Sequence, residues 1–271
     1  MDLIFYQVIA EAMNREKVVK SKTSSDDVVT ETDKKVEELL INGLKAEFPD
    51  HRFIAEESCV TTYYEDPGDY EANTELPTWI IDPLDGTINF VHGYPQVCVS
   101  VALWAEGRPQ LGFVYNPVLD QLFSARTGHG AFLNGRRINV SDKTALVDSL
   151  VGGDIMAYLS QPKKLENTIA NARAVKSRCH AFRVPGTVAV TLAYVAMGAL
   201  DAYYETGPRS WDFAAGVALV LEAGGVITAT DGSPFDLFER NIVAGATPQL
   251  AKELSSVLTP YALPREGREK T

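Results

Sequence analysis

The sequence predicts a layered fold of the α+β or α/β class, in which helices pack on sheets. Three observations favour it. Helical periodicity marks residues 2–20 and the segment that opens at Asp33. Short strand candidates then follow one another closely through residues 78–133, and helices alternate with strands after Ser141. Elements arranged in such blocks bury their apolar faces by stacking as layers.

The N-terminal part is expected to hold two amphipathic helices. In the first, Leu3, Ile4, Val8 and Ala12 recur at helical spacing. Residues 28–30 form a short extended piece, and the second helix must end before Pro49 because the residue preceding a proline avoids helical geometry.

The rest of the chain divides into a strand-rich middle and a mixed C-terminal part. Turn signals at 107–109 and 134–135 separate the strand candidates of the middle. We expect strands at 53–55, 78–81, 97–104, 112–115, 121–125, 131–133, 149–153, 202–204, 226–228 and 242–244. Helices are expected at 162–175, 186–197, 211–223 and 248–257.

Composition limits the possible partners. The chain has 271 residues, 45% of them hydrophobic, and a net charge of −11, so it would repel a nucleic-acid backbone. It would also repel a phosphate ester unless a bound divalent metal reversed the local charge. The three cysteines, Cys59, Cys98 and Cys179, form no paired pattern, which argues against a disulfide framework.

No membrane association is expected. The first 17 residues carry charged side chains among apolar ones and lack the pattern of a signal peptide. The longest nearly apolar run, residues 188–200, is too short to span a bilayer. These features predict a cytoplasmic protein.

The strongest chemical signal lies in residues 79–90. An apolar strand candidate runs into Asp82 and Pro83, and Asp85 follows three residues later. Two carboxylates on a rigid turn at a strand end can share hard cations, which prefer oxygen ligands, and the Leu84 carbonyl could add another. On this spacing alone, it is equally plausible that Asp82 and Asp85 only cap a turn or helix.

Three distant segments together resemble the metal-site motifs of the inositol monophosphatase family. They are residues 56–58, residues 82–87, and Trp211 with Asp212. The resemblance extends over about residues 28–257 and includes 130–135, 201–205 and 222–225. It implies the α-β-α-β-α sandwich of the inositol monophosphatase and fructose-1,6-bisphosphatase type. It also implies Mg²⁺-dependent hydrolysis of inositol monophosphate, two to three Mg²⁺ per subunit, inhibition by lithium and a homodimer.

The resemblance also implies a role for each matched residue. Glu56, Asp82 and the Leu84 carbonyl match the ligands of a first Mg²⁺, and Asp82, Asp85 and Asp212 match those of a second, while a third is held near Glu56. Thr87 and Asp33 match the pair that orients the attacking water. The substrate would contact Gly86, Thr87, Gly186, Thr187, Val188, Glu205 and Asp212.

The implied mechanism is electrostatic. Metals would neutralise the phosphate, activate the water and stabilise the leaving alkoxide, so that the water attacks in line without a covalent phosphoenzyme. The chain would then comprise an N-terminal lobe, residues 1–141, with most of the metal ligands. A C-terminal lobe, residues 142–263, would complete the site, and residues 264–271 would form a flexible tail.

Several alternatives and departures stay open. Asp33 could be an ordinary helix N-cap, and Glu57 is better explained as a surface carboxylate than as a ligand. The loop at residues 61–77 is longer than in the close animal relatives, and the segment 152–155 lacks the serine that the family has near it. The substrate could instead be a nucleotide 3′-phosphate, a sugar phosphate or histidinol phosphate, or the protein could be a scaffold without catalysis.

Overall fold

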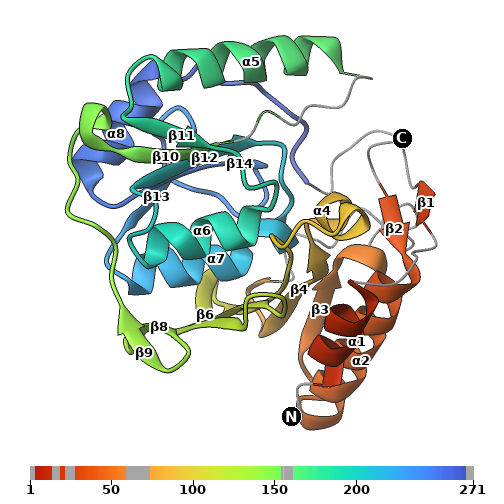
Figure 1. Ribbon diagram of the computed structural model, residues 1–271. Helices are drawn as coiled ribbons and strands as arrows, with labels where there is room; N and C mark the ends of the chain where they lie inside the picture. Colours follow the sequence, from red (N-terminus) through yellow and green to blue (C-terminus); the bar gives the residue numbers. More distant parts are fainter. Residues whose placement is uncertain are drawn as a thin grey trace.

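The fold has five layers, helices–sheet–helices–sheet–helices, as the family resemblance implied (Figure 1). The structure is a computed structural model and describes residues 4–13, 19–21, 28–58, 74–153, 155 and 161–266. Three clusters of buried apolar side chains fill the spaces between successive layers.

The first sheet is a seven-stranded meander. Its strand order follows the chain, and every neighbouring pair except the first is antiparallel. Short turns join the later strands from residue 98 onward, and tight connections of this kind join antiparallel neighbours. Its strands are β3 (Arg52–Ala55), β4 (Thr78–Asp85), β5 (Cys98–Ala105), β6 (Arg108–Asn116), β7 (Gln121–Arg126), β8 (Gly130–Leu133) and β9 (Arg136–Ile138).

Two helices cover the outer face of this sheet, α1 (Ile4–Ala12) and α2 (Glu31–Glu47). Val36, Leu40 and Leu44 recur every fourth residue along α2 and are buried against the sheet. The predicted helix over residues 2–20 is wrong at its C-terminal end, because β1 (Val19–Ser21) pairs with β2 (Val28–Thr30).

The second sheet has five strands and mixed directions. Its order is β11 (Ala181–Arg183), β10 (Leu150–Gly153), β12 (Ala202–Thr206), β14 (Asn241–Gly245) and β13 (Val226–Thr228). The helices α5 (Pro162–Lys176) and α8 (Pro248–Val257) cover its outer face, where the short η2 (Leu146–Asp148) meets α8.

Two almost wholly apolar helices form the middle layer, α6 (Val188–Ala196) and α7 (Ser210–Glu222). A helix that is apolar on every side must be buried on every side, and here a sheet lies on each. The two helices approach closely at Gly216, where a Cβ atom would lie 2.5 Å from the Leu192 side chain.

The two sheets come from successive parts of the chain, with residues up to 138 in the first and residues from 150 onward in the second. Because α6 and α7 follow the second sheet's first strand yet pack on the first sheet, both parts share one core. Arg265 and Glu266, at the start of the expected tail, contact the C-terminal part, and Glu266 is buried.

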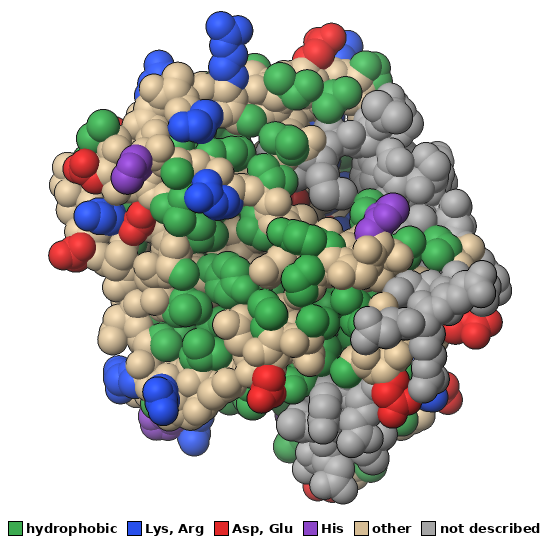
Figure 2. All heavy atoms as spheres, viewed as in Figure 1, with side chains coloured by type: hydrophobic (Ala, Val, Ile, Leu, Met, Phe, Trp, Pro, Cys, Tyr) green, Lys and Arg blue, Asp and Glu red, His purple; other side chains and the backbone are tan. Residues whose placement is uncertain are grey.

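The surface offers no sign of a membrane span: none of the described helices is long and apolar enough to cross a bilayer. On the face drawn in Figure 2, apolar side chains gather over the centre and charged ones lie mostly around the edge. Several carboxylates are instead buried in the interior, among them Asp33, Asp82 and Asp85.

Candidate active site

A β-bulge at the end of β4 brings Asp82 and Asp85 to the same face of the first sheet. Asp82 pairs with Ser100 and Asp85 pairs with Cys98, so three steps along β4 match two along β5. In a regular strand, residues three apart point to opposite faces. The extra residue in the bulge shifts the alternation of side chains by one position. Both carboxylates therefore lie on the same face of the sheet, toward the middle helices.

Pro83 lies inside this bulge. The predicted strand at 78–81 is too short, since β4 continues through Pro83 to Asp85. Proline is tolerated at bulges because the ladder there does not need its missing N–H. Asp82 Oδ1 accepts a hydrogen bond of 2.9 Å from the Leu84 amide, which stabilises the bulged backbone.

Glu56 reaches the same place from β3. This strand runs parallel to β4 and pairs Ala55 with Ile81. The residues that follow are Asp82 on β4 and Glu56, which begins a helical turn at 56–58 just after β3 ends. Carboxyl ends of parallel neighbours meet at the same sheet edge, which places the two carboxylates side by side. The charge of Glu56 accordingly helps to raise the pKa of Asp82.

Asp212 comes from the first turn of α7. This helix packs across β4, β5 and β6, and the Ser100 hydroxyl donates to the Trp211 carbonyl at 3.2 Å. Trp211 itself is buried in the middle layer. The backbone amide of Arg209 donates to Asp212 Oδ2 at 2.5 Å, which orients the carboxylate.

Burial and mutual repulsion make these carboxylates reluctant to ionise. Burial, with the charges of Glu56, Asp85 and Asp212, raises the pKa of Asp82 well above its usual range. Burial and the charges of Asp85 and Glu56 raise the pKa of Asp212 likewise. Burial also raises the pKa of Asp85 to about 6, although hydrogen bonds from Thr187 and Ala189 oppose the shift.

Asp85 also caps the helix α6. Its Oδ2 accepts hydrogen bonds from the Thr187 hydroxyl at 2.6 Å and the Ala189 amide at 2.7 Å. The alternative that Asp82 and Asp85 cap a turn or a helix therefore describes part of what they do. It does not account for the convergence of Glu56 and Asp212 on the same pair.

Thr87 and Asp33 meet across the edge of this cluster. Thr87 is the first residue of α4 (Thr87–His92), and its hydroxyl lies 3.2 Å from Asp33 Oδ1. Asp33 Oδ2 accepts the Thr30 amide at 2.9 Å and the Thr30 hydroxyl, which forms a capping box on α2. The residue that caps α2 is thus Thr30, while Asp33 serves both the cap and Thr87.

Asp33 is itself buried close to the cluster. Burial, opposed by the hydrogen bonds from Thr30 and reinforced by the charge of Glu56, raises the pKa of Asp33 to about 6. A carboxyl group with this pKa is mostly ionised at neutral pH and can accept a proton as the pH falls toward 6.

Gly86 provides the sharp turn between the bulge and α4. Its φ of +88° lies in the left-handed region, and a Cβ atom would approach the Gln96 carbonyl oxygen to 2.8 Å. Only glycine meets both conditions. The chain can then present the first amides of α4, which have no acceptor inside the helix, toward the carboxylate cluster.

The expected substrate contacts lie on both sides of α6. Gly186 and Thr187 precede the helix and Val188 begins it, and Asn89 of α4 donates to the carbonyls of Pro185 and Gly186 at 3.0 and 3.3 Å. Glu205 lies near the end of β12, half-buried, and accepts a hydrogen bond from the Tyr203 hydroxyl.

The donor set suits a hard cation. Carboxylates from Glu56, Asp82, Asp85 and Asp212 and the Leu84 carbonyl supply only oxygen, the ligand type that Mg²⁺ and Ca²⁺ prefer. The hydrogen bonds named above engage one oxygen of each aspartate and leave the second for a ligand. In the side-chain positions shown, however, the described residues contain no group of three such side chains already gathered around one point.

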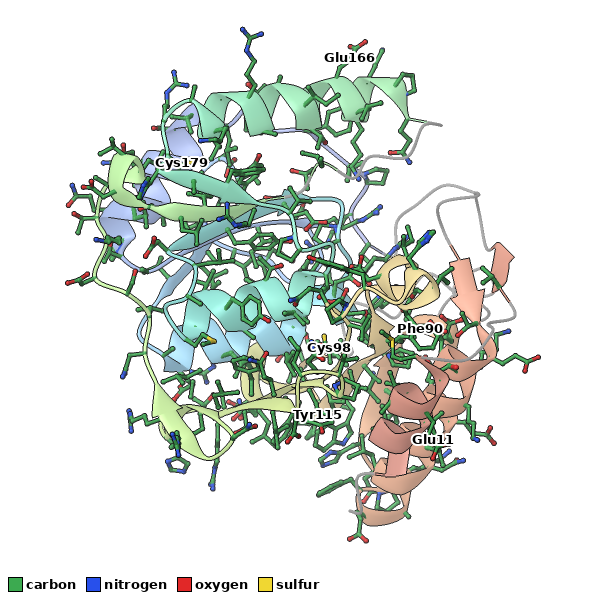
Figure 3. The ribbon with its side chains drawn as sticks, in the orientation of Figure 1. Glu11, Phe90, Cys98, Tyr115, Glu166 and Cys179 are labelled. Atoms are coloured by element: carbon green, nitrogen blue, oxygen red, sulfur yellow. The ribbon has the colours of Figure 1, made fainter. Side chains whose placement is uncertain are left out.

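Some neighbours of the carboxylate cluster were not predicted from the sequence. Cys98 faces Asp85, with Sγ 3.9 Å from Oδ2, in the interior near the middle helices (Figure 3). Glu37 accepts the Glu57 amide at 2.7 Å and the Ser58 hydroxyl, and so holds the segment after Glu56. The Thr30 cap was detectable from its spacing to Asp33. Residues 59–73 and Asp154 lie outside the described part.

Comparison with known proteins agrees with this geometry. The profile of the inositol monophosphatase family matches residues 2–261. Inositol monophosphatase 2 of Rattus norvegicus is 40% identical over 253 residues, which cover 93% of this chain and 85% of that protein. The crystal structure of extragenic suppressor protein SuhB from Bartonella henselae superposes with a TM-score of 0.82 at 33% identity, covering 94% of this chain and 93% of that one.

A third relative extends the agreement. The inositol monophosphatase structure from Anabaena has a TM-score of 0.78 at 34% identity, and the match covers 94% of this chain and 90% of that one. The relationship thus holds for sequence and for fold along nearly the whole chain. The chain belongs to the inositol monophosphatase family and is a phosphomonoester hydrolase.

Proposed function

We propose that this phosphatase hydrolyses inositol monophosphate to myo-inositol and phosphate, with Mg²⁺ held by the carboxylate cluster. The observation that carries the proposal is the mutual proximity of four carboxylates, from β4, from α7 and from the turn after β3, beside the Thr87–Asp33 pair. Buried like charges are costly unless a cation offsets them. Hydrolysis of a phosphomonoester dianion needs the same compensation.

The cation would be held by Glu56, Asp82, Asp85, Asp212 and the Leu84 carbonyl. When bound, Mg²⁺ supplies positive charge for the phosphate and makes a nearby water easier to deprotonate. Binding requires the second carboxylate oxygens to turn toward a shared ion. We infer two to three ions per subunit from the resemblance to the family.

The Thr87 hydroxyl is placed to position the attacking water. It has one proton and two acceptors, Asp33 Oδ1 at 3.2 Å and the Leu84 carbonyl at 3.1 Å. When it donates to Asp33, its lone pairs are available to a water proton. By accepting the Thr87 proton, Asp33 would determine the direction in which the Thr87 oxygen accepts a hydrogen bond from the water.

The amides of Gly86 and Thr87 would bind the phosphate, since they open α4 without an intrahelical acceptor. Glu205, with the backbone at Gly186, Thr187 and Val188, would accept hydrogen bonds from the hydroxyls of the inositol ring. A carboxylate accepts from a polyol and repels a second phosphate, which favours a monophosphate.

A phosphate-release panel tests this function. Inositol 1-phosphate, 3′-phosphoadenosine 5′-phosphate, a sugar phosphate and histidinol phosphate are compared with and without Mg²⁺. The highest kcat/KM is expected for inositol 1-phosphate, and only with Mg²⁺. A higher kcat/KM for one of the other esters would refute inositol monophosphate as the substrate. No activity on any of the esters would support the alternative of a scaffold protein without catalysis.

Two further properties complete the proposal. The enzyme is proposed to act in the cytoplasm, on the basis of its sequence, and as a homodimer, on the basis of its family. Sedimentation of the purified chain checks the second, because a monomer at micromolar concentration contradicts it. Lithium inhibition of the Mg²⁺-dependent turnover is expected as well.

A further inference from the structure

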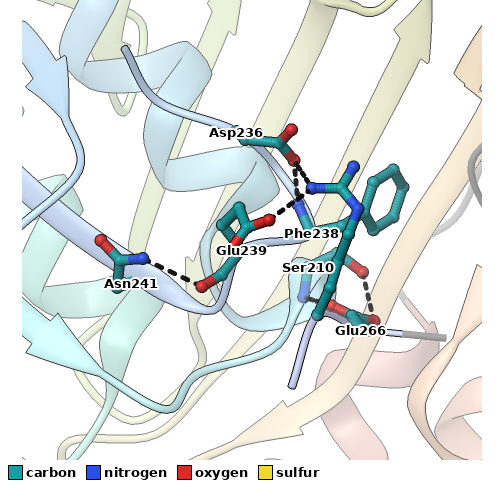
Figure 4. Close-up of polar contacts among 7 residues, drawn as sticks. Ser210, Asp236, Phe238, Glu239, Asn241 and Glu266 are labelled. Carbon is teal, nitrogen blue, oxygen red and sulfur yellow. Dashed lines mark hydrogen bonds and ion pairs between the residues drawn. The ribbon is translucent and has the colours of Figure 1, made fainter. Parts of the chain in front are cut away.

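The end of the described chain packs onto the helix that carries Asp212. Glu266 is fully buried, and its two carboxylate oxygens accept hydrogen bonds from Ser210 (Figure 4). The Ser210 amide donates to Oε2 at 2.8 Å and the Ser210 hydroxyl to Oε1 at 2.9 Å. The amide of Glu266 in turn donates to the Phe238 carbonyl at 2.9 Å.

Ser210 is the first residue of α7, and its amide has no acceptor inside the helix. The residue before it, Arg209, makes no side-chain cap bond, because a guanidinium cannot accept a hydrogen bond. Glu266 supplies the missing acceptor from a distant part of the sequence. A carboxylate in this position also complements the positive end of the helix dipole.

A second set of contacts anchors the segment from outside. Arg265 pairs with Asp236 at 2.8 Å and Glu239 at 3.1 Å, and its guanidinium lies 5.6 Å from the centre of the Phe238 ring. Phe238 is buried in the middle layer. The segment is therefore held at Arg265 as well as at Glu266.

Asp212 lies only two residues beyond Ser210, in the same helical turn. The body of α7 is held by buried apolar side chains from Trp211 to Val220, so its first turn is the part that local contacts must orient. Contacts that orient it include the Asp212 bond to the Arg209 amide, the Ser100 bond to the Trp211 carbonyl and the Glu266 bonds to Ser210.

We propose that Glu266 is a positioning residue, which fixes the first turn of α7 so that the Asp212 carboxylate is correctly placed for the catalytic cation. The inference rests on the proposed function, because it assumes that Asp212 binds the metal. Its consequence is that an interaction near the end of the chain sets the metal requirement of a site built mainly from the N-terminal half.

The test compares Mg²⁺ titrations of turnover at saturating substrate for four variants of the full chain. Glu266→Ala is expected to raise the Mg²⁺ concentration for half-maximal rate on the order of tenfold, as loss of an outer hydrogen-bond partner does at metal sites. Glu266→Gln keeps one acceptor oxygen, and a smaller rise is expected. Ser210→Ala removes one hydrogen bond and leaves every charge in place, and it should also raise the requirement.

Glu222→Ala is the matched control. Glu222 is the last residue of the same helix, and its carboxylate likewise accepts two backbone amides, from Gly128 at 2.9 Å and Gly130 at 2.7 Å. Its loss should lower thermal stability and leave the Mg²⁺ requirement unchanged. Direct Mg²⁺ binding by calorimetry should follow the same order as the kinetic titrations.

Each outcome decides a separate question. An unchanged Mg²⁺ requirement in both Glu266 variants overturns the inference, and if Glu266→Ala does not fold, Glu266→Gln decides alone. A rise in the Glu266 variants with none in Ser210→Ala shows that charge acts instead of position, which also overturns it. Wild-type turnover without any Mg²⁺ dependence would refute the proposed function itself.

Discussion

The Thr87 hydroxyl bridges two chemically different acceptors, with Asp33 Oδ1 at 3.2 Å and the Leu84 carbonyl oxygen at 3.1 Å. Thr87 lies 54 positions from Asp33 in the chain, and the contact joins the first turns of α4 and α2. It links the residue that would orient water to a carboxylate whose pKa is raised to about 6 by burial.

Asp33→Asn should reduce kcat by about 10²- to 10⁴-fold with little change in KM, the range expected for loss of a group that manages a proton. The amide can still accept the Thr30 bonds, so the fold should survive, as circular dichroism would show. Thr87→Ser, which keeps the hydroxyl, should retain most activity, whereas Thr87→Val should not. Equal activities in Thr87→Ser and Thr87→Val would exclude the water-orienting role.

Asp212→Asn should lower turnover by several orders of magnitude and yet leave the metal-free protein as stable as the wild type, or more so. Burial and the charges of Asp85 and Glu56 raise the pKa of Asp212, so replacing its carboxylate by an amide relieves both the desolvation and the repulsion. Thermal melting in chelator gives the stability, and phosphate release gives the rate. Near-normal turnover would contradict the assignment of Asp212 to the metal site.

The stability of the metal-free enzyme should fall as the pH rises from about 4 to 7. The pKa values of Asp33 and Asp85 are raised from 3.8 to about 6, so the folded state binds more protons than the unfolded state in that window. A bound divalent cation favours the ionised carboxylates and should reverse the trend. Melting at about pH 5 and pH 7.5, with Mg²⁺ or with chelator, should show the larger Mg²⁺ gain at the higher pH. Equal gains at both values would count against cation binding by this cluster.

Gly86→Ala should be destabilising and should lower activity, because the new Cβ meets the Gln96 carbonyl oxygen at 2.8 Å. Gly93→Ala is the matched control: Gly93 has a φ of +70° at the other end of α4, and nothing lies within 4 Å of its Cβ position. The control should cost about 1–2 kcal/mol of unfolding free energy, the cost of the left-handed conformation alone. If Gly86→Ala lowers the unfolding free energy no more than Gly93→Ala does, the close approach to the Gln96 carbonyl oxygen does not require glycine at position 86.

Tyr203→Phe should raise KM for inositol 1-phosphate several-fold and change kcat little. The buried Tyr203 hydroxyl donates to the Glu205 carboxylate, which holds the proposed acceptor for the inositol hydroxyls in place. Loss of an orienting bond weakens binding in the ground and transition states alike. A fall in kcat at constant KM would assign Tyr203 to another step.

The sequence predicted most of the elements because apolar periodicity and turn residues are local properties. It located β4, β5 and the middle helices, and the family resemblance supplied the five layers. Local patterns were less informative where pairing decides the structure. Residues 19–21 pair with 28–30 instead of extending a helix, and β4 continues past Pro83 because β5 accommodates a bulge there.

The sequence by itself determined which residue types are available to the site: a pair of aspartates at a strand end, a glycine and a threonine after them, and a few remote carboxylates. Only the tertiary structure decided how they combine. The bulge puts Asp82 and Asp85 on one face, parallel pairing brings Glu56 beside them, and α7 adds Asp212. It also showed that Asp85 caps α6 and that Glu266 reaches Ser210, 56 positions away. Such contacts depend on register and packing between distant segments, which local sequence does not encode.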